Sequence, residues 1–258
     1  IESIQNPKVH LEDFRLILSS FFLVVCVVCV GHCWPTTVVC FDTVERSLLA
    51  NNSLVDSRID MAHTLRRLAD ALGARYVAAI AMQYGGNQGL GSTLAQAAQS
   101  YYLLDSLGLD AADMGQLVGF ASIPWQLKSL FGLLSDTVPL GGLHRSPYML
   151  VAGTVGVVAN SVLALTPAEA VSYAGACLLL LCGKLNVALA DVMIDATVAE
   201  QTARWPHLGA DLQAMCWCTL GMCSAVANAG SGFFISTLGP RFLYGCAAAA
   251  SSLAIVPG

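Results

Sequence analysis

The sequence predicts an all-α membrane protein, and its composition, its apolar runs and the links between them indicate this. Of the 258 residues, 56% are hydrophobic and only 11% are charged, and the mean hydropathy is +0.66. A soluble domain averages about 25% charged residues, so this set is too small to cover a surface in water. The apolar runs approach the length of about 20 residues that a membrane-spanning helix needs. Short polar links join the runs, which predicts antiparallel neighbours.

We expect a transmembrane lobe over residues 76–258, with six helical spans. Their predicted bounds are 76–104, 114–135, 148–166, 169–190, 212–236 and 241–257. The first run is the longest and most polar, and the third and sixth are close to the lower limit for a span. The chain begins with Ile1, not Met, and the sixth run stops at Pro257-Gly258, so we expect a longer gene product.

The link between the second and third runs, Gly132–Tyr148, predicts a tight hairpin at a membrane surface. It holds Asp136, two Pro and a Gly-Gly pair, which break a helix or resist burial in lipid. Arginines gather before the first span and in the links after the even-numbered spans: Arg58, Arg66, Arg67, Arg75, Arg145 and Arg204. The positive-inside rule therefore places this hairpin in the cytoplasm.

Residues 1–75 differ from the rest and form a predicted N-terminal extension. The apolar segment 16–31 is short for a span and is typical of a signal or an anchor. Residues 58–73 predict a basic amphipathic helix, which lies either on the cytoplasmic leaflet or free in solvent. Cys26, Cys29, His32 and Cys33 have metal-like spacing. In a Val-Cys run we interpret the cysteines as small apolar residues, so no metal or cofactor is expected.

Charged residues inside the predicted spans are the first candidates for a functional site. Lys184, Asp191 and Asp195 are 7 and 4 residues apart, so they share one face of a helix. Lys128 lies near the middle of the second run. A charge at the bilayer centre costs about 2.5–3.5 kcal/mol and usually faces a cavity or a partner. Two interpretations stay open: a Lys–Asp pair that locks the helices together, and a polar path for a solute or a proton.

The first run favours such a path, although its polar residues also fit bonding between helices. Gln88, Ser92, Gln96 and Gln99 fall on one helical face. Four glycines in the same run, which favour close helix contact or local unwinding, are Gly85, Gly86, Gly89 and Gly91.

Several strings resemble the folate–biopterin transporter family of the major facilitator superfamily. They are Gln99–Leu109 (QSYYLLDSLGL), Ile123–Asp136 (IPWQLKSLFGLLSD), Ala188–Glu200 (ALADVMIDATVAE) and Leu212–Trp217 (LQAMCW). Gly132 and Asp136, followed by Arg145, resemble the cytoplasmic motif of the superfamily. Thr137 and Val138 replace its usual basic and glycine residues, and His144 stands where a second basic residue is common.

The resemblance implies a secondary transporter that moves folate, biopterin or related pterins across a membrane, often together with protons. It implies twelve helices in two lobes, of which this chain holds the six-helix N-terminal lobe and lacks the C-terminal lobe. The alternative is a truncated, non-transporting half-lobe that serves as a membrane scaffold. The protein is expected to be an integral, multi-pass membrane protein surrounded by lipid, in either the plasma membrane or a plastid membrane.

Roles for the candidate residues follow from this resemblance and from simple chemistry. Asp191 or Asp195 accepts the amino and ring N–H groups of a pterin, and the other carries a proton. Lys128 and Lys184 meet the carboxylates of a folate, and Gln88 and Gln99 line the path. Gly132, Asp136 and Arg145 form a cytoplasmic gate.

The sequence speaks against two other classes of protein. The net charge of −5 argues against nucleic-acid binding, which usually needs a basic face. We find no Ser-His-Asp set and no phosphate-binding loop, so an enzyme is not expected.

Overall fold

The computed structural model describes residues 63–256, and within that range every regular element is a helix. The chain divides after Ala78 into two units, which are described separately. In the first unit, residues 63–72 are helical and Gly73 follows with φ of +90°, a conformation with which helices often end. The apolar segment 16–31, the cysteine cluster near residue 30 and residues 58–62 of the predicted amphipathic helix lie outside the described residues.

The helices follow the order of the six predicted runs. The first run forms α4 (Ala74–Ile80), η1 (Ala81–Ser92), α5 (Thr93–Tyr101) and η2 (Tyr102–Ser106) without a break. The second forms α6 (Ala111–Ala121), α7 (Ile123–Gln126) and α8 (Lys128–Thr137). The remaining long helices are α9 (Ser146–Leu165), α10 (Tyr173–Arg204), α11 (Gly209–Leu238) and α12 (Pro240–Ser251), with short turns η3 (Ala168–Ala170), η4 (Pro206–Leu208) and η5 (Ser252–Ala254).

Among residues 63–256, four helical segments are long and apolar enough to cross a membrane: Ala111–Thr137, Ser146–Leu165, Tyr173–Arg204 and Pro206–Leu238. They correspond to the second, third, fourth and fifth predicted spans. The first and sixth predicted spans are not among them, and α12 has only 12 residues. Large apolar side chains lie on the outside of these helices, and Leu165, Trp217 and Leu178 are 78%, 65% and 62% exposed. Lipid is the solvent that suits such a surface.

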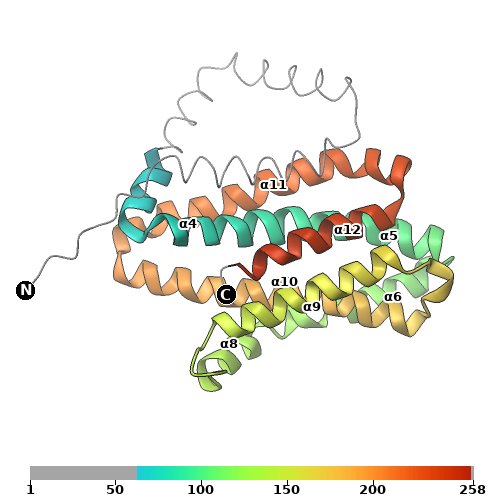
Figure 1. Ribbon diagram of the computed structural model, residues 1–258, viewed down its shortest axis with the longest axis horizontal. Helices are drawn as coiled ribbons and strands as arrows, with labels where there is room; N and C mark the ends of the chain where they lie inside the picture. The colour runs from blue at the N-terminus through green and yellow to red at the C-terminus, as the bar shows by residue number, and fades with distance from the viewer. Residues whose placement is uncertain (1–62, 257–258) are drawn as a thin grey trace, which may run out of the picture. The chain divides into compact units, whose positions relative to one another are not determined.

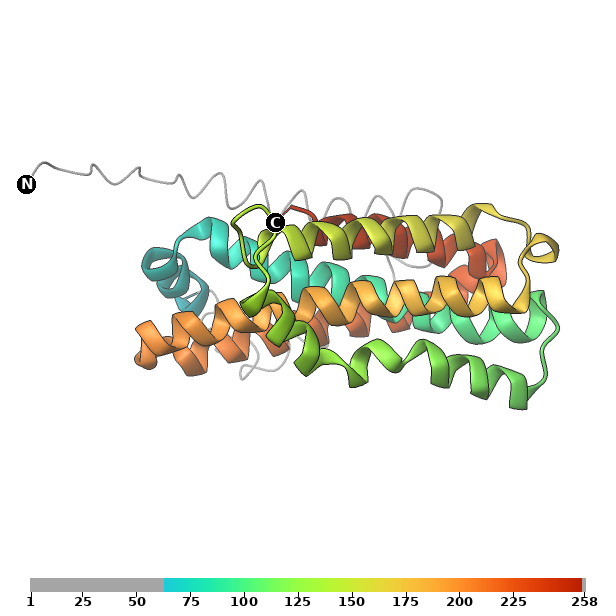
Figure 2. The same ribbon diagram turned by 90° about the horizontal axis from the view of Figure 1, so that it is seen from below.

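Helix α10 holds the second unit together. It packs along α9 on one side and against α6, α7 and α8 on another, and it also meets η1. Helix α12 packs between α9 and the first run, while α11 packs along η1 and α5. Figure 1 shows α9, α10 and α12 running alongside one another, and Figure 2 shows the bend between α6 and α8. Pro124 lies at this bend, where it removes a helix hydrogen bond.

Two helices extend past the predicted bounds of their spans. Helix α10 continues beyond residue 190, where the predicted fourth span ends, to Arg204, so Asp191 and Asp195 lie well inside it. Charged residues after position 190 indicate where lipid contact ends, but they are compatible with a continuing helix. Helix α8 likewise continues through Asp136 to Thr137. The hairpin turn therefore begins at Val138, whose carbonyl accepts a 2.7 Å hydrogen bond from the Tyr148 hydroxyl.

The glycine-rich part of the first run forms a π-helix over Ala81–Ser92. A π-helix changes the number of residues per turn, so Gln88 and Ser92 are not related to Gln96 and Gln99 of α5 by a single helical spacing. Within α5, Gln99 is buried and Gln96 is exposed. The glycines do allow close contact, as predicted. A Cβ atom on Gly89 would lie 2.9 Å from the Cβ of Cys223 in α11.

Candidate functional site

Lys128 of α8 and Asp191 of α10, two of the charged residues predicted for the site, contact each other in the second unit. Lys128, the first residue of α8, donates from Nζ to the Asp191 carboxylate and forms an ion pair with it. The Asp191 side chain is 5% exposed and the Lys128 side chain 30%. The Lys128 ammonium also lies 4.6 Å from the ring centroid of Trp125, a favourable cation–π position. The predicted Lys–Asp pair therefore exists, and it joins the second run to α10.

Asp195, one turn beyond Asp191 on α10, faces the π-helix. Its carboxylate accepts a hydrogen bond from the hydroxyl of Tyr84, while the residue itself stays exposed. Gln88 of η1 is a polar neighbour of Asp191. Two carboxylates, one ammonium, one phenol and one amide thus form a continuous polar cluster between η1, α8 and α10. We call Tyr84, Gln88, Lys128, Asp191 and Asp195 the carboxylate cluster.

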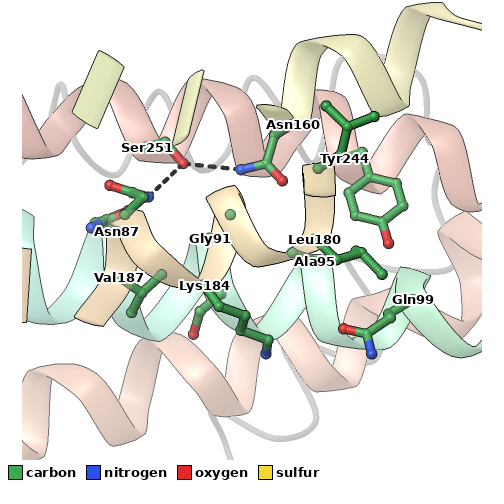
Figure 3. Close-up of a pocket in the computed structure, with 14 residues that line it drawn as sticks. Asn87, Gly91, Ala95, Gln99, Asn160, Leu180, Lys184, Val187, Tyr244 and Ser251 are labelled. Carbon is green, nitrogen blue, oxygen red and sulfur yellow. Dashed lines mark hydrogen bonds between the residues drawn. The ribbon is translucent and has the colours of Figure 1, made fainter. Parts of the chain in front are cut away.

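Lys184 lies apart from this cluster, at a pocket between η1, α5, α9, α10 and α12. Figure 3 shows the pocket, which is partly open. Its polar lining comes from Asn87, Ser92, Gln99, Asn160, Lys184, Asn186, Tyr244 and Ser251. No carboxylate is among the lining residues. We call this the Lys184 pocket.

Amide side chains connect four helices at one end of the Lys184 pocket. Asn186 of α10 donates to Asn87 of η1 at 3.0 Å and to the Ser251 hydroxyl of α12 at 3.1 Å. Asn160 of α9 donates to the same hydroxyl at 3.2 Å (Figure 3). Asn186 packs directly on Gly156, where a Cβ atom would overlap its side chain. These buried bonds fix the spacing of the helices around the pocket.

The residues predicted for the cytoplasmic gate occupy both sides of the hairpin turn, but they do not pair with each other. Arg145 forms an ion pair with Glu200 near the end of α10, at 2.6 Å. Asp136 is exposed and makes no ion pair with any residue in the described range. Gly132 lies inside α8, where a Cβ atom would meet Val192 at 3.5 Å, so this position is packed against α10.

Sequence reasoning missed the partners of the predicted residues. Tyr84 and Tyr244 gave no signal, because a single polar residue in a helical run has no period to identify it. Glu200 lies beyond the predicted fourth span. Asn186, two residues after Lys184 on α10, belongs to the amide network. Among residues 63–256, no cluster of His, Cys, Asp and Glu is suited to a metal ion.

Comparison with known proteins connects this arrangement to transporters. The model of the BT1 family matches residues 88–257, which include almost all of the residues described above. A probable folate-biopterin transporter 2 of Arabidopsis thaliana is 31% identical over 181 residues, or 70% of this chain and 36% of that protein. The folate-biopterin transporter of a Synechocystis species is 35% identical over 153 residues, or 58% of this chain and 30% of that protein. No solved structure matches the chain.

A further relative in Arabidopsis thaliana, probable folate-biopterin transporter 9, is named as chloroplastic; it is 28% identical and covers 62% of this chain and 29% of that protein. The chain thus spans about a third of the length of these relatives.

The resemblance seen in the sequence strings is confirmed. The long apolar helices and the family together identify an integral membrane protein. Since the family model covers more than half of the residues, the chain belongs to the BT1 family.

Proposed function

We propose that the protein is a secondary transporter that moves folate, biopterin or related pterins across a membrane together with protons. The carboxylate cluster is the observation that carries this proposal. It places two carboxylates and a lysine within apolar helices, where such groups are costly and usually serve a function. The relatives are named as folate-biopterin transporters, which favours transport over the scaffold alternative.

Asp195 is the proposed pterin-binding carboxylate. It is exposed, so a ligand can reach it, and Tyr84 holds its side chain in place. A pterin presents an amino group beside a ring N–H, and a carboxylate accepts two such donors side by side. Gln88, half-buried next to Asp191, extends the polar surface that the ring would meet.

Asp191 is the proposed proton carrier. Its carboxylate is buried and neutralised by Lys128, with Gln88 and Asp195 as its other polar neighbours. Protonation of Asp191 removes the charge that holds Lys128, so it would separate α8 from α10 at this point. This separation is a physical means of coupling proton binding to a change in helix packing.

We further propose that this unit works with a second helical lobe, as in major facilitator transporters. The relatives are much longer than this chain, and in such transporters the substrate site lies between two repeats near the bilayer midplane. The Arg145–Glu200 ion pair, together with the exposed Asp136 of α8 and Gly132 packed against α10, would then form the cytoplasmic gate. Exposed ion pairs contribute little stability and can open easily.

Uptake of labelled folate and biopterin into vesicles tests the proposal, with the protein expressed from its complete reading frame. We expect uptake to increase with an inward proton gradient. Asp195→Asn should lose uptake of both compounds, and Asp191→Asn should keep uptake but lose its response to the gradient. If both variants retain uptake and its dependence on pH, these two roles are wrong. If the unchanged protein takes up neither compound under any gradient, the transport function itself is wrong.

A further inference from the structure

The Lys184 pocket carries a positive charge without a negative partner. Lys128, the other lysine within the long apolar helices, is neutralised by Asp191. Lys184 makes no ion pair with any residue between 63 and 256, and no acidic side chain lines its pocket. Leaving an ammonium group partly out of water without a counter-charge is unfavourable. The pocket is therefore electrostatically suited to an anion.

Two further polar groups of the pocket are buried without a hydrogen-bond partner. One is the hydroxyl of Tyr244, a residue with 0% exposure, and the other is Oδ1 of Asn186, a residue with 1% exposure. In Figure 3, the Lys184 side chain extends toward the Gln99 side of the pocket, and the Tyr244 hydroxyl points the same way. Lys184, Tyr244 and the Gln99 amide can each donate hydrogen bonds to an anion there.

The remaining group, Asn186 Oδ1, can only accept hydrogen bonds, and it therefore limits where an anion can bind. Its side-chain nitrogen is already used by Asn87 and Ser251 in the amide network. An anion is repelled from this oxygen, so it fits the opposite, Gln99 end of the pocket. A carboxylate is the right kind of anion, because it is small, planar and accepts bonds from several donors at once.

The position of the pocket on α10 connects it to the carboxylate cluster. Lys184 precedes Asp191 by two helical turns on the same face, so the two residues are separated by about 10 Å along the helix axis. We propose that the Lys184 pocket binds the carboxylate of a conjugated pterin and so distinguishes anionic folates from uncharged pterins. This assignment rests on the proposed function and adds the recognition of charge to it. A folate carries its carboxylates at the end away from the ring, whereas biopterin has none.

Binding to the purified protein tests this assignment without requiring transport. Folate and biopterin affinities are measured for the unchanged protein, for Lys184→Gln and for Tyr244→Phe. Lys184→Gln should weaken folate binding by about 10- to 100-fold, because a charge-assisted hydrogen bond is lost. Tyr244→Phe should weaken it by about 2- to 10-fold, since only a neutral donor is removed. Biopterin affinity should change less than twofold in both variants.

Arg204→Gln is the matched control, because it removes an exposed cation from the end of the same helix, and it should leave both affinities unchanged. If either pocket variant weakens folate and biopterin alike, or weakens neither, the assignment is overturned while the proposed function stands. If the unchanged protein binds neither compound, the proposed function falls and the assignment falls with it. Should Lys184→Gln fail to fold, Tyr244→Phe still decides, because it keeps the aromatic ring and its packing.

Discussion

Replacing Lys128 should destabilise the protein by a different amount than replacing Asp191, because the two side chains of this ion pair are buried to different extents. Lys128→Met leaves the Asp191 carboxylate, which is 5% exposed, without its counter-charge. Breaking a buried pair in this way costs about 3–5 kcal/mol. Asp191→Asn instead leaves Lys128, which is 30% exposed and rests on Trp125. A lysine there can turn its ammonium toward water, so we expect a cost of about 1–3 kcal/mol.

The double variant, Lys128→Met with Asp191→Asn, leaves no uncompensated charge at the site. It should therefore be more stable than Lys128→Met alone. Thermal unfolding of the purified protein measures these differences, at about 2–4 °C for each kcal/mol in a chain of this size. We expect Lys128→Met to lower the midpoint by about 10 °C and the double variant to recover at least half of this loss. Equal losses for the two single variants, or a double variant whose loss is their sum, would refute the reasoning.

Three further predictions concern other contacts. Gly156→Ala should lower the free energy of unfolding by about 1–3 kcal/mol, because the added Cβ atom displaces Asn186 from the amide network. Gly221→Ala has no atom within 4 Å of the added carbon and should be neutral or slightly stabilising, so unfolding of the two variants decides whether packing is responsible. Tyr84→Phe should lower pterin uptake while unfolding shifts by only about 0.5–1.5 kcal/mol; unchanged uptake would remove Tyr84 from the site. Glu200→Gln should lower the free energy of unfolding by less than about 1 kcal/mol, because the Arg145–Glu200 pair is a surface contact screened by salt. A loss of stability that persists in high salt would contradict this.

The sequence predicted the charged face of α10 correctly but did not predict the neighbours of that face. The spacings of 7 and 4 residues hold because α10 is a regular helix around Lys184, Asp191 and Asp195. Residues on one face still meet different helices when they are separated along the axis. Asp191 therefore meets α8, while Lys184 lines a pocket with α5 and α12. Periodicity in one segment contains no information about which partner helix lies at each height.

Two other differences between the sequence pattern and the structure have local physical causes. A face calculated with 3.6 residues per turn does not apply to Ala81–Ser92, where glycines and amides allow a π-helix against α11. Helix α10 extends past the predicted fourth span because hydropathy reports contact with lipid, not the hydrogen bonding of the backbone. Glu200, the partner of Arg145, lies in this last part of the helix.

The length of α10 has a mechanical consequence. Its 32 residues extend for about 48 Å, well beyond a hydrocarbon core of about 30 Å. One stiff rod thus carries Asp191 at the ion pair with α8 and, nine residues farther on, Glu200 at the ion pair beside the turn. A tilt of this rod acts as a lever, because the displacement it produces grows with distance from the pivot. A small movement near Asp191 is therefore transmitted, enlarged, to the contact between Glu200 and Arg145.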